Sequence, residues 1–466
     1  MNKITVEEIL KAVSGRLITG RDDVTVSGVK HDSRECSAGD MFVAVCGENH
    51  DGHQYIPAVL EAGASAVMVS HEGAWKDKAE ELGVPAIMVD DTVYAMGEFA
   101  KYYLGTLDIK KVAVTGSVGK TSVRDMTYYV LSEKYNCGRN MKNYNNEIGL
   151  PLSIFQFDDS TEAAVLEMGM SDFGEIDRLA EIVKPDIGII TNIGVSHIEN
   201  LGSREGIFRA KMELAGHIAE NGTLIFAESD MLTKASTAGI YSQVSVGYSE
   251  NDDYIISDVD DRGIGGIEFT LEHGSDSSRI DLPVPGAHNA VNSSLAIAAG
   301  EVLGVTVGEA VKGLGKTELT GRRLRFIRGE RLDVIDDTYN ASPDSMKSAL
   351  KVLEQSGFRA GADAHRIAVL GDMFELGSES MRQHREVGEF AGKLGIDLLI
   401  AVGSDAKYIC EGASGGSVKT VFFSSKDELL EKICDLTGYG DIVLVKGSRG
   451  MKMEQAVEKL LEYQEL

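Results

Sequence analysis

The sequence predicts an α/β protein of three domains, of which the central one is built around a mostly parallel sheet. The chain has 466 residues, and a domain usually holds about 100–200 residues. Short apolar runs alternate with helix-like stretches, which is the pattern of parallel sheets covered by helices. One of these strands, residues 111–115, leads through a glycine-rich turn into a helix. We expect the domains to span residues 1–90, 91–320 and 321–466.

The charge of the chain limits the class of partner. The formal net charge is −27 and the isoelectric point is about 4.8. An acidic chain lacks the basic surface that nucleic-acid phosphates require, so we expect no nucleic-acid partner. Local lysines and glycine loops can still bind a small anionic ligand, and the acidity itself is typical of a well-solvated surface.

The cysteines and the N-terminus favour a cytoplasmic protein. The five cysteines are odd in number and form no CxxC pair, which is typical of a reduced chain. The first residues predict an amphipathic helix, with Thr5 and Glu8 as its capping box, rather than a signal peptide. No apolar run approaches the ~18 residues that span a bilayer, so we expect no membrane insertion. A monomer is the expected state.

The first domain is predicted to carry two polar loops between its short strands. The loops cover residues 31–40 and 47–55. They contain side chains suited to a polar ligand, namely Asp32, Ser33, Arg34, Asn49, Asp51 and His53. From composition alone, two ordinary solvated loops are an equal alternative. Residues 92–104 then predict a linking helix.

The second domain begins with a predicted phosphate-binding loop. Residues 112–114 form a short buried strand, residues 116–119 a tight turn, and Lys120 and Thr121 open a helix. Backbone N–H groups and the helix dipole at such a turn attract an anion. The lysine would reach the outer phosphates and the threonine hydroxyl would hold Mg²⁺. Val114 stands where the general pattern has its first glycine, and a plain strand-turn-helix is the alternative.

Two further side chains are expected beside this loop. Glu167 ends the next strand, and His197 lies just past the strand that follows. The carboxyl ends of parallel strands meet at one edge of a sheet, so Thr121, Glu167 and His197 could converge there. Oxygen ligands with one imidazole suit Mg²⁺ or Mn²⁺ better than a structural zinc. Taken alone, either residue could instead be a hydrogen-bonded loop residue.

Lys211 lies on the apolar stripe of a predicted helix. It comes four residues after Ile207 and three before Leu214. A lysine there usually extends its amine to solvent. The alternative is a partly buried amine with a lowered pKa, which could act near a metal or react with CO₂ to form an anionic carbamate.

Residues 241–285 alternate apolar and polar side chains, which predicts a small antiparallel insertion. Asn289 and Asn292 then open a helix, three residues apart and therefore on one side of it. Two amides facing the same way could pair with a purine edge or cap the helix, and the sequence does not separate these alternatives.

The third domain is predicted to be another open α/β sheet whose strands end in polar turns. These turns cover residues 336–340, 371–373 and 446–449, and Arg322 follows the probable hinge. A domain that presents arginine and lysine could close over a nucleotide bound to the second domain. Such closure excludes water from a reactive intermediate.

Nearly the whole chain resembles the Mur ligase family. The segments that carry the resemblance include VTGSVGKTSV, EMGMSDFGEIDRL, PGAHNAVN, DDTYNASPDSM, GDMFELG and VKGSRGMKME. The resemblance implies an N-terminal UDP-binding domain, a central P-loop ATPase domain and a C-terminal Rossmann-like domain. Val114 in place of the first loop glycine is normal for this family.

The resemblance also implies an activity in peptidoglycan precursor synthesis. The enzyme would be an ATP- and Mg²⁺-dependent ligase that joins D-alanyl-D-alanine (D-Ala-D-Ala) to UDP-N-acetylmuramoyl-tripeptide (UDP-MurNAc-tripeptide). The reaction would pass through an acyl phosphate and give the pentapeptide, ADP and phosphate. The alternatives are a related amide ligase, such as a folylpolyglutamate synthase-like enzyme, a P-loop ATPase without an amine acceptor, and an inactive binding protein.

Particular residues gain roles through the resemblance. The phosphates of ATP would contact Thr115, Gly116, Ser117, Val118, Gly119, Lys120, Thr121 and Ser122. The rest of the nucleotide site would be formed by Asn289, Asn292, Arg322 and Asp337. Of two Mg²⁺ ions, one would be held by Thr121 and Glu167, and the other by His197 and a carbamylated Lys211. The catalytic set would be Lys120, Glu167, His197 and Lys211.

The substrates would be contacted by residues of all three domains. The UDP-sugar would face Ser33, Arg34, Asp51, Gly52 and His53. The path of the peptide would be lined by Asn143, Asn145 and Asn146. The third domain would add Tyr339, Asn340, Lys446 and Arg449, near the nucleotide or the incoming dipeptide.

Overall fold

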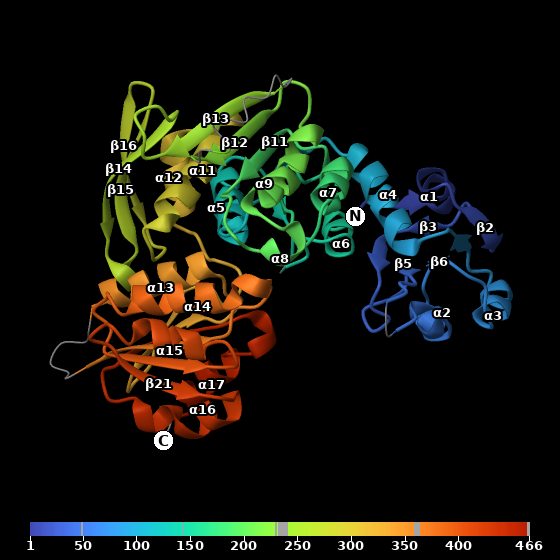
Figure 1. The fold of residues 1–466 in the computed structure, drawn as a ribbon. Helices are drawn as coiled ribbons and strands as arrows, with labels where there is room; N and C mark the ends of the chain where they lie inside the picture. The colour runs from blue at the N-terminus through green and yellow to red at the C-terminus, as the bar shows by residue number, and fades with distance from the viewer. Residues whose placement is uncertain (48–49, 142, 229–230, 232–240, 358–363, 464–466) are drawn as a thin grey trace.

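The computed structural model describes the chain except residues 48–49, 142, 229–230, 232–240, 358–363 and 464–466 (Figure 1). Within the described residues, three larger sheets divide the chain into an N-terminal, a central and a third unit. Figure 1 shows the blue N-terminal unit joined to the central unit through α4, and the orange-red third unit packed against the other end of the central unit. Among the described helices, none is long and apolar enough to cross a membrane.

The N-terminal unit is a small α/β unit, as expected. Its sheet has the order β2-β7-β6-β5-β4, parallel except for the β2–β7 pair, and β1 pairs with β3 beside it. The predicted capping box of Thr5 and Glu8 starts the first helix. The strands are Ile4–Thr5, Arg16–Thr19, Thr25–Val26, Gly28–Lys30, Asp40–Val43, Ala66–Val69 and Ala86–Met88 (β1–β7). The helices are α1 (Val6–Val13), η1 (Gly52–Tyr55), α2 (Ile56–Glu61) and α3 (Trp75–Leu82).

The predicted linking helix is α4 (Thr92–Gly105), and it joins two cores into one. Asp91 caps it through the N–H groups of the residues that follow. Its buried Phe99 and Tyr103 belong to a cluster that contains both Ile9 of α1 and Phe155 of the central unit. The N-terminal unit is therefore fixed to the central unit by apolar packing.

The central sheet has the order β16-β15-β14-β13-β12-β11-β8-β10-β9. It is parallel from β9 through β14 and antiparallel at the β14–β15 and β15–β16 pairs. The predicted insertion at residues 241–285 is therefore antiparallel only at its outer strands, and it extends the main sheet instead of standing apart. The strands are β8 (Lys110–Thr115), β9 (Cys137–Arg139), β10 (Ala163–Glu167), β11 (Ile187–Ile190), β12 (Thr223–Ala227), β13 (Ser242–Gly247), β14 (Tyr254–Asp261), β15 (Ile267–His273) and β16 (Asp276–Leu282).

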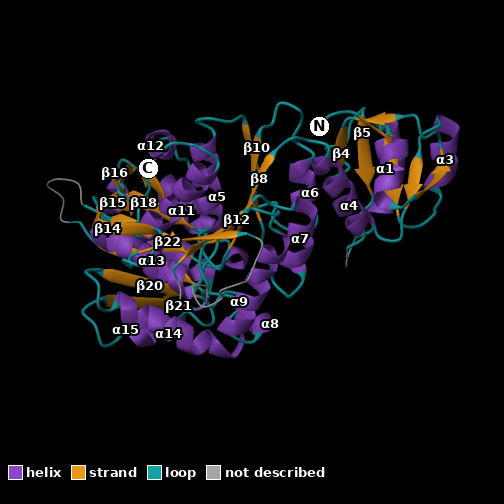
Figure 2. Cartoon of the chain, turned by 90° about the horizontal axis from the view of Figure 1, so that it is seen from above, coloured by secondary structure: helices purple, strands orange, loops and turns teal. Residues whose placement is uncertain are grey.

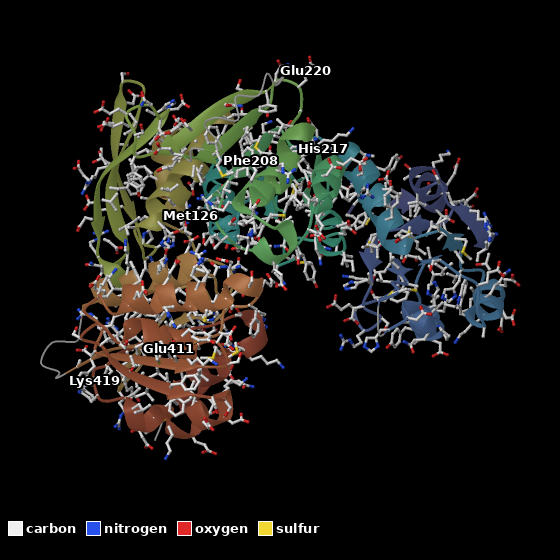
Figure 3. The ribbon with its side chains drawn as sticks, viewed as in Figure 1. Met126, Phe208, His217, Glu220, Glu411 and Lys419 are labelled. Atoms are coloured by element: carbon white, nitrogen blue, oxygen red, sulfur yellow. The ribbon has the colours of Figure 1, made fainter. Side chains whose placement is uncertain are left out.

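Helices cover both faces of the central sheet (Figure 2). Val112 and Val114 of β8 pack into one core with α5 and α11, while Ala113 faces the core of α7 and α9. Met126 and Phe208 mark these two faces (Figure 3). Strands buried on both faces explain the continuous apolar runs in the sequence. The helices are α5 (Lys120–Leu131), α6 (Gly149–Ile154), α7 (Glu175–Val183), α8 (Ile198–Leu201), α9 (Arg204–Met212), η2 (Glu213–His217), η3 (Gly263–Gly265), α11 (His288–Val302) and α12 (Val307–Leu314).

The third unit is the predicted open α/β sheet, in the order β17-β18-β22-β19-β20-β21 with only β17 antiparallel among the described strands. Ser342 caps α13 and Pro343 is its first residue, as predicted. The strands are β17 (Arg325–Arg328), β18 (Asp333–Asp337), β19 (Arg366–Gly371), β20 (Leu398–Val402), β21 (Lys419–Phe423) and β22 (Ile442–Lys446). The helices are α13 (Pro343–Gln355), η4 (Gly377–Glu379), α14 (Ser380–Ala391), α15 (Lys407–Ala413), α16 (Lys426–Lys432), η5 (Ile433–Leu436), η6 (Arg449–Met451) and α17 (Glu454–Glu462).

Candidate active site

A cavity of about 520 Å³ lies between the central and third units. The turns after β8, β10 and β11 line one side of it, and the ends of β18 and β22 with the turn after β19 line the other. Ligands of α/β sheets bind at this edge. The cavity brings together the predicted residues Ser117, Val118, Gly119, Lys120, Thr121, Ser122, Asn145, Asn146, Glu167, His197, Asn289, Asn292, Asp337, Tyr339, Asn340, Lys446 and Arg449.

The glycine turn has the geometry of an anion-binding loop. Gly116 has φ 147° and Gly119 has φ 85°, and a Cβ on Gly116 would lie 1.9 Å from Thr191 Oγ1. Lys120 Nζ donates to the carbonyl of Gly116 at 2.8 Å, and burial lowers the pKa of this amine while Glu167 opposes the change. Because Gly119 has no side chain to cap α5, the first N–H groups of that helix are open to an anion.

Thr121 and Glu167 meet as the sequence predicted. The Thr121 hydroxyl donates to Glu167 Oε2 at 2.7 Å, and Asn145 Nδ2 donates to Oε1 at 2.8 Å. Asn140 fixes the end of β10, because its side chain bonds both the N–H and the carbonyl of Glu167. This buried carboxylate and the hydroxyl beside it are a hard-oxygen donor set that suits Mg²⁺.

A buried charge network behind this pair was missed by the sequence analysis. Arg124 is fully buried, donates to Asp125 Oδ1 at 2.6 Å and lies 3.4 Å from Glu167 Oε2. Asp125 also accepts from Arg139 at 2.9 Å and from the backbone N–H of Thr320, in the segment before the third unit, at 2.6 Å. The sequence signal for this network was a pair of opposite charges in the helix that follows the phosphate loop. Such a pair also occurs on exposed helices, so it did not indicate burial.

His197 contacts a residue that the sequence analysis also missed. Its Nδ1 lies 2.8 Å from Oε2 of Glu375, which belongs to the third unit and lines the same cavity. The contact with His197 lowers the pKa of Glu375, and the charge of Lys120 adds to this effect. The place of Glu375 inside the quoted segment GDMFELG was the signal that could have identified it.

Lys211 is buried, which rules out the prediction that its amine extends to solvent. The residue is 1% exposed. Burial lowers its pKa well below the usual value, and the nearby charge of Lys120 lowers it further. Lys211 lies outside the cavity lining. A lower pKa increases the neutral fraction of the amine, which is the form that reacts with CO₂.

Asn289 and Asn292 lie side by side near the start of α11, both buried and both lining the cavity. Asn292 Nδ2 donates to Asn289 Oδ1 at 2.7 Å, and Asn289 Nδ2 donates to the carbonyl of Pro285, also at 2.7 Å. A Cβ on Gly119 would lie 2.9 Å from Asn292 Oδ1. The pair therefore packs directly against the phosphate loop, and neither amide oxygen caps α11 in the described contacts.

Acid should destabilise the protein through His288, which lines the same cavity. Burial lowers the pKa of His288 from 6.5 to about 4, and Lys446 adds to the shift. The folded pKa lies below the unfolded one, so the unfolded chain gains a proton first and stability falls as the pH drops from 6.5 towards 4. From pH 7 to pH 5 we expect a loss of about 2 kcal/mol. Urea unfolding should show a smaller pH dependence in His288→Gln, and equal pH dependence in both proteins would contradict this.

The third unit contributes a buried ion pair to the cavity wall. Lys446 Nζ lies 2.6 Å from Asp337 Oδ2 and donates to the carbonyl of Asn340 at 2.9 Å. Asp337 also accepts from the backbone N–H of Leu324 at 3.2 Å. Burial raises the pKa of Asp337, and Lys446 opposes the change. The pair joins the ends of β18 and β22, and therefore fixes the two strands that face the phosphate loop.

The structure places Arg323, and not Arg322, on the cavity. Arg323 stacks on the ring of Tyr339, with 3.8 Å between the guanidinium carbon and the ring centroid. Arg322 instead lies 3.8 Å from Asp336 and 3.2 Å from Glu458 and is outside the lining. Neighbouring residues of an irregular segment point to different sides, which the sequence pattern did not resolve.

Three predicted residues of the central unit lie near the cavity without lining it. Thr115 Oγ1 donates to the carbonyl of Met168 and so holds β8 against the end of β10. Gly116 lies against Thr191, behind the loop surface. Asn143 is exposed and outside the lining.

The predicted UDP-sugar residues lie in the N-terminal unit, outside the cavity lining. Arg34 pairs with Asp32 at 2.6 Å, which lowers the pKa of Asp32, and Ser33 lies between them. Gly52 packs tightly, because a Cβ there would lie 2.8 Å from the backbone of Val45. Asn49 lies outside the described residues.

Asp51 and His53 form a hydrogen-bonded group with two neighbours. His53 Nδ1 lies 2.6 Å from Asp51, its Nε2 accepts from the N–H of Ser70 at 3.0 Å, and its ring stacks on His71 at 3.8 Å. Cys46 completes a set of donors within 4.8 Å of one another. Because Ser70 occupies Nε2 of His53, a cation at Nδ1 would require an imidazolate, so this group fits a polar ligand better than a metal.

Three family models match the chain. They are described as the Mur ligase family catalytic domain (residues 25–104), the Mur ligase middle domain (residues 114–300) and the Mur ligase glutamate ligase domain (residues 322–449). They cover parts of the N-terminal, central and third units in that order.

Whole-chain relatives and solved structures agree with these matches. A Bacillus subtilis protein named UDP-N-acetylmuramoyl-tripeptide–D-alanyl-D-alanine ligase is 38% identical over 467 residues, which is 99% of each chain. The Escherichia coli protein of the same name is 32% identical over 470 residues, again 99% of each. A crystal structure of MurF from Acinetobacter baumannii matches with a TM-score of 0.90, 30% identity and 99% coverage of each chain. MurF ligase from Thermotoga maritima in complex with ADP matches with a TM-score of 0.82, 28% identity and coverage of 94% of this chain and 98% of that one.

Proposed function

This chain belongs to the Mur ligase family, and we propose on that premise that it joins D-Ala-D-Ala to UDP-MurNAc-tripeptide with ATP. The product would be UDP-N-acetylmuramoyl-pentapeptide, a peptidoglycan precursor, with release of ADP and phosphate. The observation that carries the proposal is a cavity in which the phosphate loop faces the polar turns of the third unit. A relative of the same fold was crystallised with ADP, which supports nucleotide binding at this loop.

We infer that ATP binds along the phosphate loop and the start of α5. Lys120 would leave its bond to the Gly116 carbonyl and meet the outer phosphates. The Asn289 and Asn292 pair, packed against the loop, would face the adenine. From the third unit, Arg323, which lines the cavity, would contact the nucleotide in place of Arg322.

The donor set of the central unit fits hard divalent cations. The Thr121 hydroxyl and the Glu167 carboxylate, 2.7 Å apart, would hold one Mg²⁺, and His197 with a carbamylated Lys211 would hold a second. Mg²⁺ supplies positive charge that stabilises the phosphoryl oxygens. Thr121 and Glu167 are already positioned for this role by Asn140 and Asn145.

The residues of the cavity suit a two-step amide synthesis. A carboxylate acylates an amine poorly, so the terminal carboxylate of the tripeptide first attacks the γ-phosphate of ATP, and ADP leaves. The amine of D-Ala-D-Ala then attacks the acyl carbon, and phosphate leaves. Lys120 and the N–H groups of α5 stabilise the charge that develops on the phosphoryl oxygens. The third unit covers the cavity, which keeps water from the acyl phosphate and holds carboxylate and amine together.

The remaining predicted residues receive substrate roles in this proposal. The UDP-sugar would bind the N-terminal unit at Ser33, Arg34, Asp51, Gly52 and His53. The tripeptide would follow Asn143, Asn145 and Asn146 towards the cavity. The dipeptide would contact the third unit at four residues that line the cavity, namely Tyr339, Asn340, Lys446 and Arg449.

Phosphate release tests the proposed function. The protein is incubated with ATP and Mg²⁺, with and without UDP-MurNAc-tripeptide and D-Ala-D-Ala, and the products are identified by mass spectrometry. The ligase predicts release that requires both substrates and a UDP-linked pentapeptide product. Release from ATP alone, unchanged by either substrate, would favour the ATPase alternative. Release with another peptide or amino acid in place of the dipeptide would favour a different amide ligase.

Carbamylation of Lys211 is expected because burial lowers the pKa of its amine and so favours the neutral form that reacts with CO₂. After incubation with ¹³C-labelled bicarbonate, ¹³C NMR should show a carbamate signal in the native protein that is lost in Lys211→Met. Phosphate release should fall in the same variant. Lys312→Met is the control, because Lys312 is 69% exposed and pairs with Glu133 away from the cavity. A carbamate signal that survives in Lys211→Met would contradict this assignment.

A further inference from the structure

Two residues in a rarely populated backbone conformation meet across the interface of the central and third units. His197 and Glu375 both have φ 63°. A left-handed conformation is strained for a residue other than glycine, and it persists where the surroundings enforce it, often at functional sites. Nδ1 of His197 lies 2.8 Å from Oε2 of Glu375. The contact is the point at which the third unit reaches the predicted metal ligands.

The turn that carries Glu375 is held rigidly from behind. Asp372 accepts hydrogen bonds from the backbone N–H groups of Ser404, Asp405 and Ala406. The N–H of Met373 donates to His384 Nε2 at 2.9 Å, and the N–H of Phe374 donates to Ser448 Oγ at 2.9 Å. Three successive residues before Glu375 are therefore tied to three different segments of the third unit, which explains how the strained residue is kept in place.

The front of the same turn fits closely against the central unit. A Cβ on Gly377 would lie 3.2 Å from Cγ of Glu199 in α8, the helix that begins directly after His197. His197 itself follows β11, whose pairing with β8 fixes it relative to the phosphate loop. The carboxylate of Glu375 and the imidazole of His197 therefore meet only where the third unit packs on the central unit.

The contact leaves one nitrogen of His197 for another partner. Nδ1 is buried and makes no hydrogen bond in the described structure, but it lies 2.8 Å from Oε2 of Glu375, which is within hydrogen-bond distance. A proton held on Nδ1 leaves the lone pair on Nε2, which is the form of histidine that binds a metal ion.

We propose that Glu375 is a positioning residue that orients His197 for metal binding, so that closure of the third unit completes the metal site. Metal-bound histidines usually donate their other N–H to a carboxylate, and here the carboxylate comes from a different domain. The inference rests on the proposed function, because it takes His197 as a metal ligand. To the proposed function it adds one residue, Glu375, and a coupling between closure of the third unit and the affinity of the site for metal.

Mn²⁺ binding measured by electron paramagnetic resonance tests this role. The probe is Mn²⁺ with ADP, titrated into the full chain. We expect Glu375→Ala to weaken one Mn²⁺ site about 10–100-fold, the usual effect of removing a second partner of a metal-bound histidine. Glu375→Gln should lose less, because an amide oxygen still accepts from Nδ1–H. Glu379→Gln is the matched control, since Glu379 is a nearby acid that pairs with Arg382 and lies outside the cavity lining.

His197→Ala separates failure of this inference from failure of the proposed function. If His197→Ala binds Mn²⁺ as tightly as the native chain, the metal role of His197 is wrong. If His197→Ala loses a site while both Glu375 variants bind as the native chain does, the positioning role alone is overturned. Hydrogen exchange gives a second measurement: Glu375→Ala should speed exchange in residues 196–202, and unchanged exchange there would count against the coupling. Should Glu375→Ala fail to fold, the Glu375→Gln titration decides.

Discussion

Replacing Lys120 by alanine should reduce the rate of phosphate release in the complete reaction about 10²–10³-fold, the usual effect of removing one preorganised charge partner of a transition state. The amine lies at the start of α5, where Ser117, Gly119 and Thr121 line the same cavity. To reach a phosphate, the amine would give up its hydrogen bonds to the carbonyls of Gly116 at 2.8 Å and Ser117 at 3.3 Å. The loss should therefore appear mainly in kcat, measured by steady-state phosphate release with both substrates present.

A matched lysine controls for the change in net charge. Lys316→Ala removes an exposed amine that pairs with Glu133 outside the cavity, and it should leave kcat within twofold of the native value. Circular dichroism of both variants should match that of the native protein. A Lys120→Ala enzyme that keeps native kcat would exclude Lys120 from the chemistry and would weaken the assignment of the loop to ATP phosphates.

The parts of the site that the sequence predicted depend on local features of one segment or on a general rule of sheet topology. A buried strand, two glycines with positive φ and a helix start are local features, so residues 112–121 could be interpreted without the rest of the chain. Glu167 and His197 followed from one topological rule, because the ends of neighbouring parallel strands meet at one edge. The place of Lys211 on an apolar helical stripe left two alternatives, an amine that extends to solvent and a buried amine, and the structure shows the buried one.

The parts that the sequence did not predict depend on how separate units face each other. Glu375 reaches His197 only because the third unit packs on α8, and no spacing within either segment encodes that contact. Arg323 and Arg322 differ by one position in an irregular segment, which has no periodicity to assign a direction. The alternation in residues 241–285 predicted the antiparallel pairs of β14, β15 and β16, but alternation alone cannot reveal that β13 pairs in parallel with β12 and β14 and so extends the main sheet.

Replacing Asp125 by alanine should destabilise the central unit by about 3–5 kcal/mol, because it removes the carboxylate 2.6 Å from a buried guanidinium and leaves the carboxylate of Glu167 at 3.4 Å. Arg124 is fully buried, and Asp125 also holds Arg139 at 2.9 Å. The same carboxylate accepts the N–H of Thr320 at 2.6 Å, so the segment that leads to the third unit should loosen as well. Thermal unfolding followed by circular dichroism measures the first effect, and hydrogen exchange in residues 317–324 measures the second.

A double-mutant cycle separates the energy of the Arg124–Asp125 ion pair from the energy lost with each side chain. Arg124→Met with Asp125→Ala removes both members of the pair, and the double variant should lose less stability than the two single losses added together. Asp186→Ala is a useful comparison, because Asp186 accepts the N–H of Lys111 beside the same strand and carries no ion pair in the described contacts. If the losses of the two single variants simply add, the ion pair contributes no coupling. The burial of Arg124 would then be explained by packing, and the link from the phosphate-loop helix to the hinge would depend on Thr320 alone.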